Sequence, residues 1–288
     1  MEKLIVQSRA SINDTPFKEI IINDKSVNFL EYFHNREIRT LKEDLISSCH
    51  GNNYISQEQA LSTMELSKAG HNIVAIMYGG MIFAKPSVDA ALMPTVPVIS
   101  IPSDYLSFLS VCVPSGVAAV AGVGIDNFTC AARVTSEILN KKFGGVYLNN
   151  TQDKIARSLE KYKVGFLGIA NGEHSRDGIV ISKLNIGNGM GLERELSDID
   201  KMGRIVIAVP GDLNVWNIGS FSSAMKKAAN IVYTKGEENA VVLAAKFMAN
   251  YNGEARNALL DESKRKRESY DGNRKITFES FYLGEKNT

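Results

Sequence analysis

Short apolar runs, each ending in Gly, Ser, Asp or Pro and followed by helical periodicity, recur along this chain of 288 residues. Strands that are buried on both faces of a mostly parallel sheet have this continuous apolar character, and helices connect them. We therefore expect an α/β fold, a three-layer sandwich with a mostly parallel sheet. The predicted strands lie near Leu4–Val6, Ile73–Met77, Val98–Ile101, Ala118–Val123, Val164–Ile169, Arg204–Val209 and Ile231–Tyr233.

Three other segments have clear local patterns. In Asn127–Phe143 the apolar residues form one stripe and the charged residues lie opposite, which predicts an amphipathic helix, and Glu238–Tyr251 is similar. Ile20–Phe29 instead predicts a β-hairpin, because Asn23-Asp24-Lys25 supplies turn residues between two alternating runs.

An internal repeat is the most informative pattern. PVISIPSD at 97–104 aligns without a gap with IVIAVPGD at 205–212, and each is followed by a loop, a strand and a helix with an Ala-Ala pair. This favours two related halves that arose by internal duplication, and chance similarity between two buried strands is the alternative. Each half would then end a strand in a polar turn at the sheet edge where open α/β sheets bind ligands.

The polar stretch that begins at Asn149 indicates a division near residue 150. We expect an N-terminal α/β half over 1–150, a second and possibly degenerate α/β half over 151–252, and a charged tail over 253–288. The tail predicts an exposed helix followed by a loosely packed end. Its basic residues at 264–267 are flanked by acids, which favours a solvated face over a phosphate site.

Composition narrows the class of ligand. Lys and Arg number 33 against 32 Asp and Glu, so no net field attracts nucleic acid or an anionic membrane, and a small molecule is the expected partner. Three cysteines in no framework spacing indicate a reducing compartment. The chain begins without the pattern of a signal peptide and has no apolar window long enough to span a membrane, so we expect a cytoplasmic protein.

A Gly pair follows the second predicted strand. Gly79-Gly80 would let a ligand approach the backbone, and a helix that starts at Lys85-Pro86-Ser87 would offer free amides to an anion such as phosphate. A tight turn without a ligand is an equal reading of the Gly pair.

Polar residues also follow the next two predicted strands. Ser103-Asp104 could bind ribose hydroxyls or a phosphate through hydrogen bonds. Asp126-Asn127 precede the amphipathic helix, where one of them is expected to cap the helix; capping and ligand contact are compatible.

Two residues could react. Cys112 lies in the loop-like stretch VCVPSGV, where a thiolate could act as a nucleophile, although most cysteines are inert core residues. His50 in SSCHGN could be an acid/base group near neutral pH or a surface histidine, and Cys130 is expected to pack in the core. No His or Cys pair has metal-ligand spacing and no cofactor fingerprint is complete, so we predict no metal and no cofactor.

Residues 75–139 resemble the aminoimidazole ribonucleotide carboxylase/mutase superfamily, especially the carboxylase that begins nickel-pincer nucleotide synthesis. The similar elements are GGMIFAKPSV, the strand PVISIP, the turn CVPSGVAAV and IDN ahead of an Ala-rich helix. The region covers about a quarter of the chain. More weakly, SSCHG at 47–51 and SRASIND at 8–14 are similar to polar loops of the purine enzymes.

The resemblance implies a three-layer fold, a homo-oligomer and transfer of a carboxyl group to a nucleotide ring. In the nickel-pincer branch a cysteine adds covalently to a nicotinate ring, and Cys112 falls at the matching place, in a turn with Ser115 between Pro114 and Gly116. The purine enzymes' Gly-Gly-Ala-Ala-His turn is absent at 79–83, and the second half departs from both families.

The hypothesis is a nucleotide-directed carboxylase, mutase or related lyase acting on a heteroaromatic ring, with Cys112 or His50 as the reacting group. The alternative is a non-catalytic protein that binds or sequesters a nucleotide and retains the fold. Whether Cys112 lies in a pocket with cationic neighbours or in an apolar core distinguishes the two.

Overall fold

The computed structural model describes most of the chain. The described residues are 2–9, 19–46, 53–79, 85–112, 116–120, 125–149, 154–170, 177–185, 191–211 and 230–283.

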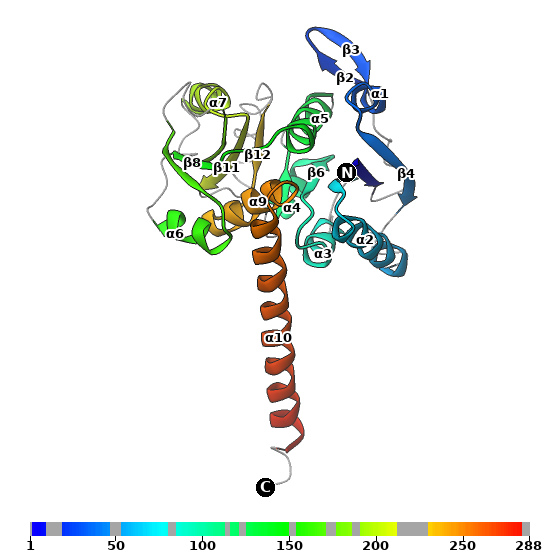
Figure 1. Cartoon of the computed structure of the whole chain (residues 1–288), viewed down its shortest axis with the longest axis vertical. Coiled ribbons are helices and arrows are strands. Elements are labelled where there is room, and N and C mark those ends of the chain that lie inside the picture. The colour runs from blue at the N-terminus through cyan, green and yellow to red at the C-terminus, as the bar shows by residue number, and fades with distance from the viewer. Residues whose placement is uncertain are drawn as a thin grey trace.

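Ten strands form one sheet, a hairpin forms a second, and helices connect them (Figure 1). The strands of the large sheet are β1 (Lys3–Arg9), β4 (Arg39–Ile46), β5 (Asn72–Gly79), β6 (Val98–Pro102), β7 (Val117–Ala119), β8 (Val146–Asn149), β9 (Phe166–Ile169), β10 (Ile179–Asn185), β11 (Ile205–Gly211) and β12 (Ile231–Tyr233). The hairpin is β2 (Glu19–Ile22) and β3 (Lys25–Asn28). The helices are α1 (Phe29–His34), α2 (Asn53–Lys68), α3 (Lys85–Leu92), α4 (Tyr105–Val111), α5 (Ile125–Asn140), α6 (Lys154–Lys161), α7 (Leu192–Asp200), α9 (Glu237–Ala249) and α10 (Gly253–Leu283).

The large sheet consists of two parallel groups of five strands. The first strand group has the order β4-β1-β5-β6-β7 and the second has the order β9-β8-β10-β11-β12. Counted from its own first strand, each group has the order 2-1-3-4-5. The groups join through their last strands, which are antiparallel and pair at Ala119 and Tyr233.

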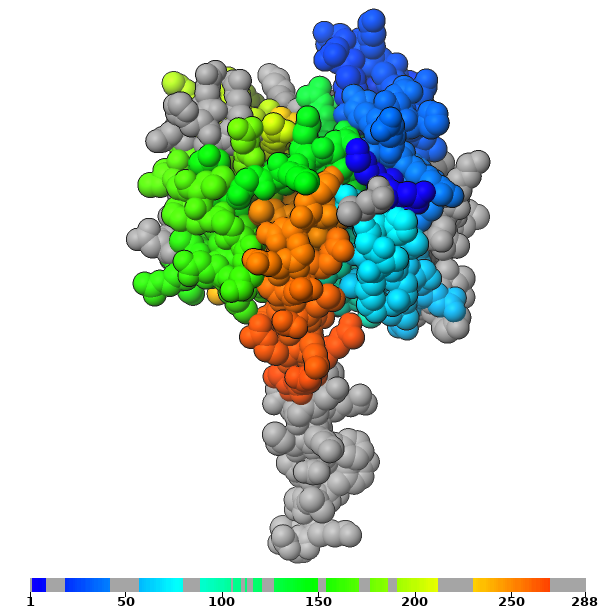
Figure 2. Space-filling view, in the orientation of Figure 1, coloured from blue at the N-terminus to red at the C-terminus, as the bar shows by residue number. Residues whose placement is uncertain are grey.

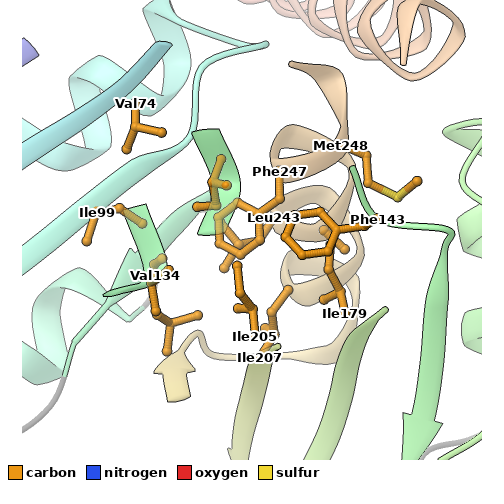
Figure 3. Close-up of a cluster of buried hydrophobic side chains, with 14 of the residues drawn as sticks. Val74, Ile99, Val134, Phe143, Ile179, Ile205, Ile207, Leu243, Phe247 and Met248 are labelled. Carbon is orange, nitrogen blue, oxygen red and sulfur yellow. The ribbon is translucent and has the colours of Figure 1, made fainter. Parts of the chain in front are cut away.

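Helices cover both faces of the sheet and make three layers. Buried residues of α1, α5, α6 and α9 belong to one core cluster, and those of α2, α3, α4 and α7 belong to the other. The first cluster continues across both strand groups: Val74 and Ile99 of the first group share it with Ile179 and Ile205 of the second, and Phe247 of α9 lies among them (Figure 3). The α/β fold and the mostly parallel sheet predicted from the apolar runs are therefore confirmed.

Each predicted strand overlaps an observed one, but the prediction missed β4, β8 and β10. The strand β4 reads RTLKEDLI and has no continuous apolar run, which is expected of a strand at the end of a sheet. The strand β8 is only four residues long and falls inside the segment 1–150. Because β8 pairs with β9 and β10, strand pairing places the division of the sheet before Val146.

The local predictions agree with the structure. The hairpin turns at Asn23 and Asp24, whose φ angles of 50° and 60° suit a tight two-residue turn. The two amphipathic segments are α5 and α9, and the tail forms the single long helix α10. The side chains at 264–267 are exposed, and three of them form ion pairs with Glu262 or Glu268, as expected for a solvated face. No helix in the described ranges is long and apolar enough to cross a bilayer.

The end of α9 and the start of α10 bind the segments that enter the first strand group. Lys246 Nζ donates to Ala90 O in the last turn of α3 at 3.1 Å and to Met93 O just after α3 at 3.0 Å. Asn250 Oδ1 accepts from Ile73 N at the start of β5. Figure 2 shows this C-terminal segment in orange between residues near 150 in green and α2 in cyan. Residues beyond the predicted division thus complete the layer over the first strand group.

Candidate functional site

The strand order of the first group reverses at β1, because β4 lies on one side of β1 and β5 lies on the other. From β1 the chain leaves toward α1 on one face, and from β5 it leaves toward α3 on the other face. Since β1 and β5 are parallel neighbours, their carboxyl ends lie side by side. Open α/β sheets with this order bind ligands outside such a switch point. The candidate site therefore begins at Ser8 of β1 and at Tyr78 and Gly79 of β5.

Two buried glutamines lie near the end of β1. Gln7 and Gln59 are 7% and 6% exposed, and Gln59 Nε2 donates to Gln7 O at 3.3 Å. Gln7 Nε2 and Gln59 Oε1 have no hydrogen-bond partner among the described residues. A buried amide donor and a buried amide acceptor without partners are costly, and a polar ligand near them would lower that cost. Sequence reasoning missed both residues, although a glutamine at the end of the run LIVQ was a visible signal.

An aromatic pair lies on one side of the same strand end. Tyr78 packs against Phe128 of α5 with ring centroids 5.2 Å apart, and Phe128 meets Phe29 of α1 edge to face at 5.8 Å. These contacts fix the start of α5 beside the carboxyl end of β5. Tyr78 is only partly buried and places an aromatic ring at this strand end, which the sequence analysis had not singled out.

Ser103 and Asp104 follow the end of β6, next to Gly79. Ser103 N donates to Gly79 O at 2.8 Å, which extends the pairing of β5 and β6 by one residue. The Asp104 carboxylate caps α4 and accepts from Ser107 N at 2.9 Å and from Ser107 Oγ at 2.7 Å. Both residues lie beyond the carboxyl end of β6, and their contact with a ligand stays a prediction. The hydrogen bonds of Asp104, however, give its carboxylate a structural role that the sequence analysis had not assigned.

The predicted capping role of Asp126 or Asn127 is wrong in detail. The helix α5 begins at Ile125, so both residues lie in its first turn and not before it. Asn127 is buried and its Nδ2 donates to Pro102 O at 3.4 Å, which ties α5 to the end of β6. The side chain of Asp126 is outside the described set.

The other ligand-edge predictions are only partly described. Ser87 lies in the first turn of α3, which begins at Lys85 as predicted, but its side chain is outside the described set. Gly80 and His50 are outside the described residues. Along the sequence, Gly80 directly follows β5, and His50 follows the end of β4 at Ile46.

Cys112 lies at the other end of the first strand group. Cys112 caps the C-terminus of α4 and precedes the amino end of β7. Ser103 follows the carboxyl end of β6. Because β6 and β7 are parallel neighbours, these two positions lie at opposite ends of the strands. Cys112 is 2% exposed and belongs to an apolar cluster. Burial raises the pKa of its thiol far above the usual range, and the charge of Lys235 only partly opposes this shift. The structure thus separates Cys112 from the ligand-edge residues with which the sequence analysis had grouped it.

We expect Cys112 to remain unmodified when the folded protein is treated with iodoacetamide at pH 7.5, because alkylation needs an accessible thiolate. Peptide mass spectrometry measures the modification, and the same protein in denaturant, where Cys112 reacts, is the control. Rapid modification of Cys112 in the folded protein would contradict its burial and would restore the covalent hypothesis.

Cys130 packs in the core as predicted. It is 2% exposed, and its Sγ lies 3.3 Å from Ile231 O, to which the thiol donates. Burial is the main cause that raises the pKa of Cys130 to about 12. Within the described part of the chain, no three His, Cys, Asp or Glu side chains gather as a metal site.

A cleft of about 580 Å³ lies away from all predicted site residues. It is bounded by the end of α5, the start of β9 and the junction of α9 and α10. Asn252 lines it, but its Oδ1 caps α10 and its Nδ2 donates to Lys163 O, so its polar groups are already used.

No protein-family model matches the chain, and no curated protein sequence matches it. The fold defines an α/β protein whose first strand group has a topological switch point between β1 and β5.

Proposed function

We propose that the protein binds a nucleotide in the crevice outside the carboxyl ends of β1 and β5. The switch point between these two strands is the observation that carries the proposal, because ligands of 2-1-3-4-5 sheets bind there. Tyr78 supplies an aromatic ring at this strand end. The amide of Gln7, which alternation along β1 places on the same face of the sheet as Ile5 and Tyr78, offers a donor for the polar edge of a heteroaromatic ring.

The binding function needs no reactive cysteine. Cys112 is buried and precedes the amino end of β7, whereas the proposed ligand lies at the carboxyl ends of the parallel strands β1 and β5. A covalent step on Cys112 therefore does not fit a ligand at this place. The geometry therefore favours a non-catalytic function, in which the protein keeps the α/β fold and binds or sequesters a nucleotide.

A carboxylase, mutase or related lyase is the second candidate. It is supported by the resemblance over 75–139 and by connectivity, since His50 and Gly80 follow strands that end at this edge. In this case His50, and not Cys112, would be the acid/base group.

A nucleotide of the right ring class is expected to raise the melting temperature of the protein. At a ligand concentration of about 100 times Kd the stabilisation is about 2.7 kcal/mol, which corresponds to roughly 5–10 °C for a chain of this size. The probes are AMP, IMP, UMP and nicotinate mononucleotide. No shift with any of them at millimolar concentration would contradict nucleotide binding.

Two further measurements locate the ligand. Tyr78→Ala is expected to weaken binding by about tenfold in calorimetric titration at low temperature, from the loss of one stacking contact. Tyr147→Ala is the matched control, because Tyr147 is also a partly buried strand tyrosine but belongs to β8. Hydrogen exchange should show new protection at the ends of β1 and β5. Protection confined to the second strand group would place the ligand elsewhere and overturn the assignment.

A further inference from the structure

One edge strand of the ten-stranded sheet exposes three apolar side chains. The strand β9 is the last in the sheet and pairs only with β8 among the described strands. Phe166, Leu167 and Ile169 are 45%, 42% and 73% exposed. The pairing of β9 with β8 shifts register between Phe166 and Gly168, so Leu167 is the extra residue of a β-bulge. A single exposed apolar residue is ordinary, whereas three along one unpaired strand form a patch.

The cause of the exposure is a short connection. In the first strand group, residues 47–71 connect β4 to β5 and include α2, whose Ala60 is buried in the core. In the second group the connection from β9 to β10 is residues 170–178, which is shorter than α2 alone. Among the described helices, α6 contacts β9.

The backbone of β9 indicates what kind of partner fits. An edge strand presents N–H and C=O groups that another strand can pair with, and natural proteins protect such edges with Lys, Pro or other charged residues. Residues 164–170 read VGFLGIA and contain neither a charge nor a proline. The opposite edge strand, β4, reads RTLKEDLI and has four charged residues. By charge and proline content β9 is therefore the less protected of the two edge strands, and its remaining protection is its short length and the register shift at Leu167.

We propose that β9 is the interface for a second copy of this chain, in which the two β9 strands pair antiparallel about a twofold axis. Because β9 carries no charge, two copies of it can pair without repulsion between like charges. A contact about a twofold axis buries the same apolar patch on both copies. The junction of β7 and β12 already joins two strand groups antiparallel within one chain, so the fold accommodates such a continuation. This proposal is independent of the nucleotide proposal.

A four-residue strand buries less than the roughly 800 Å² per partner of a standard interface, so we expect a dimer with Kd in the micromolar range. Sedimentation velocity over about 1–200 μM should show the 31.6 kDa chain shifting toward twice that mass as concentration rises.

Charges placed on the edge test the surface itself. Leu167→Lys and Ile169→Lys are expected to weaken self-association at least about 30-fold, because each brings like charges together at the twofold axis. Leu61→Lys is the matched control: Leu61 is a 53% exposed leucine of α2, and its change should leave the association unchanged. Circular dichroism verifies that the variants fold.

Three outcomes would overturn the proposal. They are a wild-type chain that stays monomeric over the whole range, a dimer that persists in both β9 variants, and a dimer that Leu61→Lys disrupts equally.

Discussion

The free energy of unfolding is expected to rise by about 3 kcal/mol between pH 7.5 and pH 9.5, because of one buried amine. Lys246 is 2% exposed and passes over Gly116, where an added Cβ would lie only 2.6 Å from Lys246 Cε. Burial lowers the pKa of Lys246 to about 7, although the nearby Asp89 carboxylate opposes the shift. Lys266 lowers it slightly further.

The sign follows from proton binding. The unfolded chain holds the Lys246 proton up to a pKa near 10.5, whereas the folded chain releases it near pH 7. Between these values the unfolded state binds more protons, so raising the pH favours the folded state by about 1.4 kcal/mol per pH unit. Below pH 7 both states are protonated and the slope from this residue disappears.

Lys246→Met should lose this slope, which denaturant titrations at a series of pH values would measure. At pH 7.5 the variant also removes the donor of Ala90 O, whereas Met93 O keeps its bond from Val96 N, and this loss costs about 1–3 kcal/mol. Lys154→Met is the control, because Lys154 is exposed and its removal should leave the pH profile unchanged. Parallel pH profiles for wild type and Lys246→Met would show that Lys246 does not titrate in this range.

Phe29→Ala is expected to lower the free energy of unfolding by about 4 kcal/mol, since it removes a fully buried ring and leaves a cavity. The ring meets Phe33 edge to face at 5.0 Å and Phe128 at 5.8 Å, so it joins α1 to the start of α5. Chemical denaturation at fixed pH measures the loss.

The neighbouring residue provides the control for Phe29. Leu30 lies in the same helix but is 42% exposed, so Leu30→Ala should cost less than about 1 kcal/mol. Equal losses in the two variants would mean that α1 is held by its helical structure and not by the aromatic contacts.

Much of the fold could be predicted because its strands are buried on both faces. Burial of this kind requires continuous apolar runs, and these are visible in β5, β6 and β11 without any knowledge of their neighbours. The strand β4 has one neighbour and a charged sequence, so the same argument failed there. The repeated octapeptides fall on β6 and β11, each the fourth strand of its group, and the duplication they suggested remains a prediction.

The candidate site was less predictable. Connectivity alone places Gly79 at the end of β5 and Ser103 just after β6. Because β5 and β6 are parallel, both residues lie at the carboxyl ends of the strands, as the sequence analysis expected. Tyr78, Gln7 and Gln59 depend on which strands and helices become neighbours, and that is a property of the sheet order. Cys112 was grouped with the wrong edge because its segment precedes β7, whose start the sequence did not distinguish from a strand end.

The sequence by itself determined the local structure: the hairpin turn at Asn23-Asp24, the helices α5 and α9, and the apolar strands. These follow from short-range preferences and from which face must be buried. Only the tertiary structure decided that the side chain of Lys246, in α9, reaches the end of α3 and that Cys112 is buried. It also decided that β9 lies at an open edge. Each depends on contacts between residues far apart in the chain, where burial and hydrogen bonding are set by neighbours that no local pattern specifies.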